Sequence, residues 1–320
     1  MFGKCKRTIL SSLLLIGSIS AAAAPVASDP LTVTVLGSGT PALTANRFGT
    51  SILVEAGGHM LMFDAGRGNV IRLAQLDRSP GQVEAVFLTH YHSDHVNGLA
   101  DLWMTGYLPF VRRSEPLRLY GPEGVIALAD GLMAAHKSDT DIRIADEGVK
   151  PETTVLEAHE ISPGVVFDED GLRVTAFNVD HGDLIKPSFG YRIDYDGKKV
   201  VLSSDTKYDP AVVEQATGAD ILIHELGVAT EQENPPAWIK KVLDHHTSPE
   251  DAGRVFSEAG VKLAVYSHMV RLNSAAGRVT PGEIVRRTRS TYPGALILAE
   301  DLMTFVVDDG IAVIPLFADE

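Results

Sequence analysis

The sequence predicts an α/β protein built around a large, layered sheet system. Short apolar segments, separated by glycine-rich turns, have the length and the alternating or continuous apolar pattern of strands packed on at least one face. Segments with helical spacing are interspersed among them in both halves of the chain. Because strands and helices alternate throughout, the pattern indicates an α/β architecture.

The predicted strands begin at residue 31. They cover residues 31–36, 51–55, 60–63, 85–89, 172–179, 189–195, 199–203, 221–224, 262–267, 295–299 and 302–307. The predicted helices cover residues 68–75, 96–104, 125–136 and 249–259. The last helix has the clearest start, because Ser248 or Thr247 can cap it and Pro249 suits its first turn. No segment has the composition of a linker, so residues 25–320 are expected to form a single domain.

Residues 1–24 have the three parts of a secretory signal peptide. A basic start precedes a short apolar core, and small residues including Ala21–Ala24 follow it. The apolar core is too short to cross a bilayer comfortably, so no stable membrane anchor is expected. Cleavage near Ala24 would remove Cys5, the only cysteine of the chain. We therefore expect a bacterial protein that is periplasmic or secreted and has no thiolate for catalysis or metal binding.

Composition narrows the class of protein further. The chain has 320 residues, a formal net charge of −14, 45% hydrophobic residues and 22% charged residues. These fractions are typical of a folded soluble protein and disfavour a disordered, fibrous or multi-span membrane protein. The acidic balance argues against a surface that binds phosphate backbones, which needs clustered lysine and arginine. Nucleic acid is therefore not expected as a partner.

The most informative segment is Thr-His-Tyr-His-Ser-Asp-His, residues 89–95, at the end of a predicted strand. His90 and His92 are two residues apart in an extended turn and point to the same side, while Asp94 and His95 start a helix and can face a second point nearby. Four ligand-type side chains within six residues fit a two-metal site better than a one-metal site. Imidazole and carboxylate ligands favour zinc, with manganese or iron as alternatives.

This segment resembles the metal-binding signature of the metallo-β-lactamase superfamily, and the resemblance covers nearly the whole of the predicted mature chain. It implies a four-layer αββα sandwich. It also implies two divalent metal ions, the first bound by His90, His92 and His181, the second by Asp94, His95 and His268, with Asp205 as the bridge. Asp64, in an early Phe-Asp-Ala-Gly motif, would support the metal loop without binding metal. Ser204 stands where the family usually has glycine.

Two further segments, residues 223–225 (Ile-His-Glu) and 245–248 (His-His-Thr-Ser), resemble the ribonuclease Z-like branch of that superfamily. By this resemblance, Glu225 and His246 form a hydrogen-bonded pair beside the metals that stabilises charge or passes a proton to the leaving group. His245 is the alternative partner of Glu225. Members that process transfer RNA carry an inserted flexible arm, commonly after a Phe-Gly-Tyr-Arg strand. Here residues 189–192 run almost directly to Asp205, which leaves no room for that arm.

The missing arm, the predicted export and the acidic charge together point away from transfer RNA processing. Asp205 as a bridging carboxylate points away from true β-lactamases. We therefore expect an exported hydrolase of small anionic esters, an arylsulfatase or phosphodiesterase, in which Asp94 also holds a metal-bridging hydroxide. A lactonase or β-lactamase is the alternative, and a ribonuclease Z-type RNA endonuclease or a non-enzymatic metal-binding protein is less favoured. A homodimer is compatible with the sequence. Candidates for sandwiching an aryl ring are Trp103, Tyr107, Phe110 and Trp238.

Overall fold

The computed structural model describes residues 29–230, 236–272 and 277–315. The predicted signal peptide at residues 1–24 lies outside these described residues. Within them, none of the helices combines the length and the apolar character that crossing a bilayer requires.

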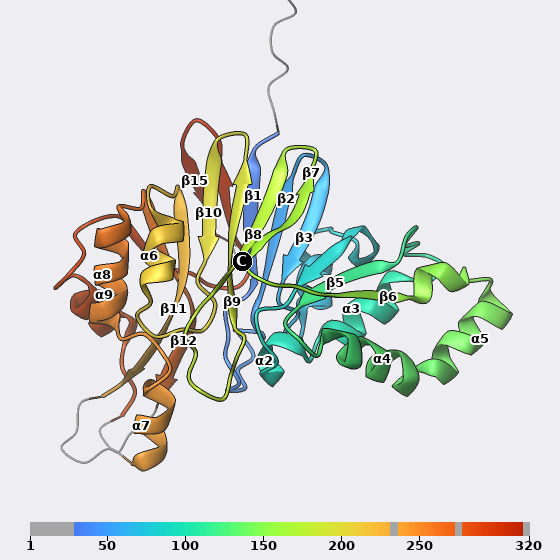
Figure 1. Ribbon diagram of the computed structural model, residues 1–320, viewed down its shortest axis with the longest axis horizontal. Coiled ribbons are helices and arrows are strands. Elements are labelled where there is room, and N and C mark those ends of the chain that lie inside the picture. The colour runs from blue at the N-terminus through green and yellow to red at the C-terminus, as the bar shows by residue number, and fades with distance from the viewer. Residues whose placement is uncertain (1–28, 231–235, 273–276, 316–320) are drawn as a thin grey trace, which may run out of the picture.

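Two mixed sheets face each other at the centre of the molecule (Figure 1). In the described part of the chain, one sheet contains β1 (Leu31–Gly37), β2 (Ser51–Ala56), β3 (His59–Phe63), β4 (Ala85–Phe87), β5 (Leu117–Gly121), β6 (Leu156–Glu160), β14 (Met303–Val307) and β15 (Ile311–Ile314). The other contains β7 (Gly164–Glu169), β8 (Leu172–Asn178), β9 (Phe189–Tyr195), β10 (Lys198–Leu202), β11 (Ile221–Ala229), β12 (Leu263–Leu272) and β13 (Leu296–Leu298). Their spatial orders are β15-β14-β1-β2-β3-β4-β5-β6 and β13-β12-β11-β10-β9-β8-β7.

The main hydrophobic core lies between the two sheets. Side chains alternate along a strand, so Val33 and Val35 of β1 face inward and pack in the same cluster as Val200 and Leu202 of β10. Two further clusters fill the space between each sheet and its helices. The sheets therefore have apolar residues on both faces, which explains why several strands have continuous apolar sequences.

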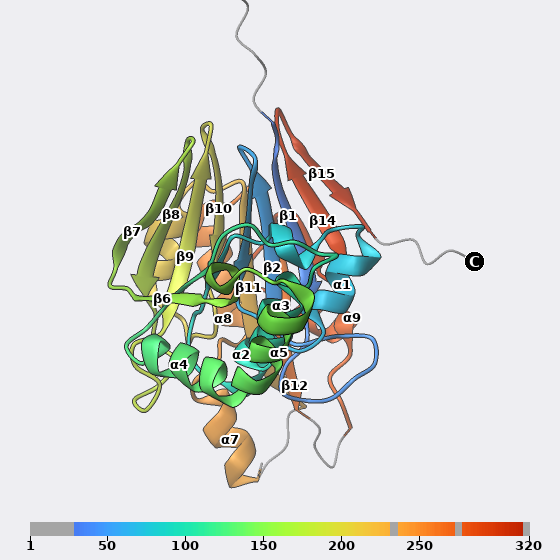
Figure 2. The same cartoon turned by 90° about the vertical axis from the view of Figure 1, so that its right-hand side faces the viewer.

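Helices cover the outer face of each sheet, as Figures 1 and 2 show. Next to the first sheet lie α1 (Asn69–Gln75), α2 (Ser93–Val96), α3 (Leu99–Gly106), α4 (Val125–Ala135) and α5 (Lys137–Glu147). Next to the second lie α6 (Pro210–Ala216), α7 (Ala237–Leu243), α8 (Pro249–Ala259) and α9 (Pro281–Thr288). Short 3-10 helices span Pro80–Gln82 and Pro151–Thr154. The helix–sheet–sheet–helix layering confirms the predicted α/β sandwich.

Each predicted strand and helix falls on an observed element, with one correction. The helix expected at residues 96–104 is two helices, α2 and α3, which meet at Gly98. The backbone N–H of Gly98 donates to Ala65 O at 2.8 Å, and a Cβ on Gly98 would lie only 2.2 Å from Gly66 O. The break therefore allows the start of α3 to approach the turn after β3 closely.

Asp301 connects the C-terminal part of the chain to the loop after β1. Its Oδ1 accepts from the backbone N–H and the hydroxyl of Ser38 at 2.8 and 2.7 Å. Its Oδ2 accepts from the backbone N–H of Phe48 at 2.8 Å and from the Arg72 guanidinium at 2.9 Å. The Asp301 side chain is only 3% exposed. These contacts hold the loop over the end of the first sheet.

Asp301→Ala is expected to lower the free energy of unfolding by about 3 kcal/mol, because it leaves Arg72 and three backbone or hydroxyl donors without their buried acceptor. Urea denaturation measures this loss. Glu300→Ala is the matched control, since the Glu300 side chain is 75% exposed and meets Arg47 at 3.4 Å. The control is expected to change stability by no more than about 0.5 kcal/mol, and equal losses in both variants would contradict the assigned role of Asp301.

Candidate metal centre

The predicted metal ligands lie together at one end of the sandwich, between the two sheets. They are His90, His92, Asp94, His95, His181, Asp205 and His268. The first four come from the loop and helix that follow β4. His181 follows β8, Asp205 follows β10, and His268 lies within β12. The fold therefore brings together side chains that are more than 170 residues apart, as the 3.0 Å contact of His268 with Asp94 illustrates.

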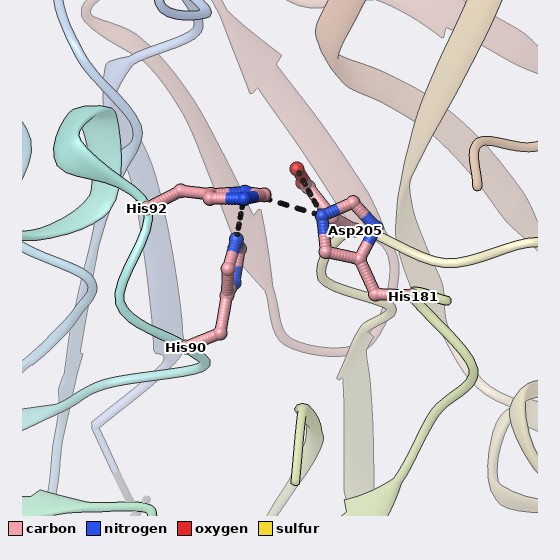
Figure 3. Close-up of side chains that lie close together, drawn as sticks. All are labelled: His90, His92, His181 and Asp205. Carbon is pink, nitrogen blue, oxygen red and sulfur yellow. Dashed lines mark hydrogen bonds and ion pairs between the residues drawn. The ribbon is translucent and has the colours of Figure 1, made fainter. Parts of the chain in front are cut away.

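The first group contains His90, His92, His181 and Asp205, which point toward one another in Figure 3. His92 Nδ1 lies 2.9 Å from His90 Nε2 and 3.3 Å from His181 Nε2. Asp205 Oδ2 lies 3.6 Å from His181 Nε2. One ligand atom of each residue lies within 4.8 Å of those of the other three, which is close enough for one ion to reach all four.

The second group contains Asp94, His95 and His268, all of them buried. Asp94 Oδ2 lies 3.0 Å from His268 Nε2. Asp205 faces this group too, because its Oδ2 lies 3.5 Å from His95 Nε2 and its Oδ1 lies 3.3 Å from His268 Nδ1. Asp205 thus lies between the two groups, the position that a bridging carboxylate requires.

The donor atoms fit a pair of divalent cations. Asp94 Oδ1, His95 Nε2 and His268 Nδ1 are buried and have no hydrogen-bond partner among the described residues. Buried polar atoms are rarely left in this state unless another ligand satisfies them. Nitrogen and oxygen donors without sulfur suit zinc, manganese or iron. The clusters can therefore hold metal, while the identity of the metal stays a prediction.

Electrostatics favours the cation-binding forms of His90 and Asp205. Burial lowers the pKa of His90 well below its ordinary value, and the neighbouring His95 lowers it further. Burial alone would raise the pKa of Asp205, but His268 and His95 beside it bring that pKa well below its usual range. Neutral imidazole and ionised carboxylate are the protonation states that offer lone pairs to a metal.

Asp64 holds the loop that carries the metal-binding histidines, through contacts with Thr89 and His95. It follows β3 with a positive φ of 57°, and its side chain points to the loop that carries the histidines. Oδ1 accepts from the backbone N–H of Thr89 at 2.8 Å, and Oδ2 accepts from His95 Nδ1 at 2.7 Å. This contact places the His95 proton on Nδ1 and leaves Nε2 directed at the second metal group.

Glu225 and His246 form the predicted pair beside the metal groups. His246 Nδ1 lies 2.7 Å from Glu225 Oε2, and both side chains are buried. Burial alone would lower the pKa of His246, but the Glu225 carboxylate raises it to about 9. The other carboxylate oxygen accepts from the backbone N–H of Thr247 at 2.7 Å. That backbone contact has no side-chain signature, so the sequence could not reveal it.

The geometry decides between the two candidate histidines. The backbone carbonyl of His245 accepts from His181 Nδ1 at 2.9 Å, and the His245 ring lies beside the ring of His181, with centroids 5.4 Å apart. Its Nδ1 is buried without a hydrogen-bond partner in the described residues. His246, and not His245, is therefore the partner of Glu225.

Residues 59–269 match the family described as a β-lactamase superfamily domain. The chain belongs to the metallo-β-lactamase superfamily. A protein named ribonuclease Z from Mycobacterium sp. (strain KMS) is 32% identical over 88% of this chain and 98% of its own length. Another with that name, from Mycobacterium marinum (strain ATCC BAA-535 / M), is 34% identical over 74% of this chain and 86% of its own length.

Solved structures share the fold of this superfamily member. The metallo-β-lactamase fold protein YhfI from Bacillus subtilis superposes with a TM-score of 0.69 and 20% identity, covering 87% of this chain and 100% of its own. Human tRNase Z, short form, superposes with a TM-score of 0.62 and 24% identity, covering 85% of this chain and 98% of its own.

These relatives overturn the prediction of an arylsulfatase or phosphodiesterase that acts on small anionic esters and avoids nucleic acid. The homologues that match most of the chain are named for action on RNA. The error came in part from using net charge, which sums the whole surface and says little about the few side chains beside a metal centre. The predicted export stays a prediction, because nothing in these relatives or in the described residues bears on it.

Two of the aromatic side chains expected at the mouth of the site are instead part of the core. Trp103 and Tyr107 are buried between α3 and the first sheet, and Trp103 Nε1 donates to Thr154 O at 3.0 Å. Their helical spacing indicated an apolar face but not the side on which the site lies. Phe110 and Trp238 are exposed.

Proposed function

We propose that this protein is a metal-dependent endoribonuclease of the ribonuclease Z type, which hydrolyses a phosphodiester bond in RNA. The observation that carries the proposal is the full set of nitrogen and oxygen donors in two adjoining groups, with the Glu225–His246 pair beside them. The 32% identity to a ribonuclease Z over 98% of that protein's length supports the choice of substrate class.

When bound by these ligands, two divalent ions supply the Lewis acidity that activates water and neutralises charge on the phosphate oxygens. Asp94 would bind metal through one carboxylate oxygen, and its other oxygen would accept a proton from the attacking water. The water oxygen bonds to phosphorus as the bond from phosphorus to the leaving oxygen breaks. His246 then donates the proton that the leaving oxygen needs, from Nε2, because Glu225 engages its Nδ1.

The proposed function is tested by cleavage of labelled RNA. The purified full chain is loaded with zinc or manganese, its metal content is measured, and it is incubated with a precursor transfer RNA and with an unstructured RNA. Cleavage into discrete fragments that stops when EDTA removes the metal is the expected result. Metal-loaded protein that leaves both RNAs intact, or that hydrolyses nitrophenyl sulfate or nitrocefin faster than RNA, would overturn the proposal.

His246→Ala is expected to lower the rate of RNA cleavage about 10²-fold, because the leaving oxygen then departs without a proton donor. The loss is expected to be much smaller on an RNA in which sulfur replaces the leaving oxygen, since a thiolate leaves without protonation. Single-turnover rates on the two substrates give the comparison. Equal losses on both would rule out a proton-donor role for His246.

A further inference from the structure

One stripe of side chains runs along α7 and starts at the metal centre. Trp238, Lys241 and His245 are spaced three and four residues apart, so they lie on one side of the helix. Asp244 keeps helical backbone angles after the last residue of α7, and its N–H donates to Lys240 O at 2.9 Å. The N–H of His245 donates to Val242 O at 3.3 Å, so His245 lies in the turn that directly follows the helix. The opposite side of α7 carries the buried Ile239 and faces β11.

We infer that this stripe, Trp238–Lys241–His245, binds a single-stranded segment of RNA next to the bond that is cleaved. The inference rests on the proposed function and adds to it the part of the substrate that lies outside the metal centre. Figures 1 and 2 show α7 projecting from the molecule beyond the ends of β11 and β12. A strand that leaves the metal centre along α7 would therefore follow a helix that is open to solvent.

The inner end of the stripe touches the metal centre. The rings of His245 and His181 have centroids 5.4 Å apart, and a Cβ on Gly182 would lie 3.4 Å from the Cβ of His245. His245 Nδ1 has no hydrogen-bond partner among the described residues, although it is buried. His245 as a whole is partly exposed, so its ring lies at the point where a strand would enter the centre.

The outer end of the stripe carries side chains of the kind that bind single-stranded nucleic acid. Trp238 is 55% exposed, which is unusual for so large an apolar side chain, and Lys241 makes no ion pair with a described residue. A base that stacks on an exposed aromatic ring beside a cation that holds phosphate is the usual combination in single-strand binding. Paired bases in a duplex do not expose their faces to such a ring, so an unpaired segment fits best.

The length of the stripe suits a short segment. Trp238 and His245 are seven positions apart, which corresponds to about 10 Å at the helical rise of about 1.5 Å per residue. Stacked nucleotides advance by about 3.4 Å each, so the stripe spans two to three of them. The positive charge of Lys241 stands out against the rest of the protein, since the chain as a whole carries a formal net charge of −14. Lys241 can therefore select phosphate at this one place without making the whole surface attract nucleic acid.

Binding of a 12-nucleotide single-stranded RNA, labelled with fluorescein, tests the inference. Anisotropy is measured on the full-length, zinc-loaded protein in the His246→Ala background, which slows turnover. Trp238→Ala is expected to raise the Kd at least about fivefold, the lower limit for loss of one stacked base. Lys241→Ala is expected to raise the Kd as well, because a phosphate contact is lost. Trp238→Phe is expected to keep the Kd within about twofold, because phenylalanine still stacks.

Lys240→Ala is the matched control. Lys240 has the same charge and is the neighbour of Lys241, but it lies off the stripe and lines a cavity between α7 and β11 that His246 lines too. Its replacement is expected to leave the Kd within about twofold, because only Lys241 lies on the stripe. Binding to a 12-base-pair RNA duplex is expected to be unaffected by all four variants. Intrinsic fluorescence adds a second readout, since Trp103 is buried and Trp238 is the other tryptophan of the chain.

The outcomes separate the two proposals. Unchanged Kd values for Trp238→Ala and Lys241→Ala, or an equal loss of affinity in Lys240→Ala, would contradict RNA binding by the stripe. If wild-type protein cleaves RNA and the stripe variants bind normally, the inference fails while the proposed function stands. If the stripe variants lose binding but metal-loaded wild-type protein cleaves no RNA, the proposed function fails while the stripe stands as an RNA-binding surface.

Discussion

Replacing Asp205 by alanine is expected to lower RNA cleavage at least about 10³-fold, because the two metal groups lose the carboxylate that they share. Asp205 faces His95 at 3.5 Å, His181 at 3.6 Å and His268 at 3.3 Å. Its loss removes a ligand from both positions and also the carboxylate that faces all three of these imidazoles. We therefore expect the variant to retain less than the full complement of metal.

Two measurements check this result. Elemental analysis after gel filtration gives the metal content, and single-turnover cleavage gives the rate. Asp183→Ala is the control for the change in net charge, because the Asp183 carboxylate is 97% exposed in the loop after His181 and pairs only with Lys186 at 3.0 Å in the described structure. Asp205→Ala protein that binds two metals per chain and cleaves RNA at the rate of the control would refute the bridging role.

Some ligands of the metal centre could be predicted from local sequence spacing, and the others only from the resemblance to a known superfamily. His90, His92, Asp94 and His95 lie within six residues, so their spacing alone indicates a shared site. His181 and Asp205 follow two separate strands, His268 lies within a third, and no local pattern links them to the others. Only the resemblance to a known superfamily connected them, and the topology then explains it, because β8, β10 and β12 belong to one sheet.

Several elements escaped prediction, and α5 and β7 did so because they lack a continuous apolar face. In the described structure α5 has no buried residue, and its exposed side chains are held by pairs four residues apart, such as Lys137–Asp141 at 2.7 Å and Arg143–Glu147 at 2.9 Å. Hydrophobic periodicity cannot detect such a helix. β7 was missed for a similar reason, since Gly164 and Val165 are exposed and only Phe167 is fully buried.

The choice between His245 and His246 shows a second limit. Neighbouring residues have the same local sequence context, and either could be placed against Glu225. The decision depends on the path of the chain after α7, where a Cβ on Gly227 would lie 2.5 Å from the Cβ of His246. Glycine at that position lets His246 pack directly against β11 and reach Glu225. Sequence spacing contains no information about this contact.

Replacing Asp64 is expected to have the second largest effect, although Asp64 binds no metal in the proposed centre. Asp64→Ala removes the acceptor of three contacts, from the Thr89 backbone N–H at 2.8 Å, the Thr89 hydroxyl at 3.0 Å and His95 Nδ1 at 2.7 Å. Because all of these donors are buried, we expect a loss of about 3 kcal/mol in the free energy of unfolding. Metal affinity is expected to fall about 10- to 100-fold in addition.

Asp64→Asn separates the two effects. The amide oxygen can still accept from the Thr89 backbone, so the loss of stability is expected to be smaller than in Asp64→Ala. The amide NH₂ in the place of Oδ2 would face His95 Nδ1, and two donors cannot pair. The His95 proton is then expected to move to Nε2, the nitrogen that lies 3.5 Å from Asp205 and faces the metal groups. A protonated Nε2 has no lone pair for a cation.

Chelator competition titrations and urea denaturation of the three proteins distinguish these cases. We expect metal affinity to fall in both variants and stability to fall mainly in Asp64→Ala. If Asp64→Asn binds metal as tightly as the wild type, Asp64 acts only through the backbone of the loop. If instead both properties fall in proportion, the loop and its ligands respond as one structural unit, and the protonation state of His95 is not what Asp64 controls.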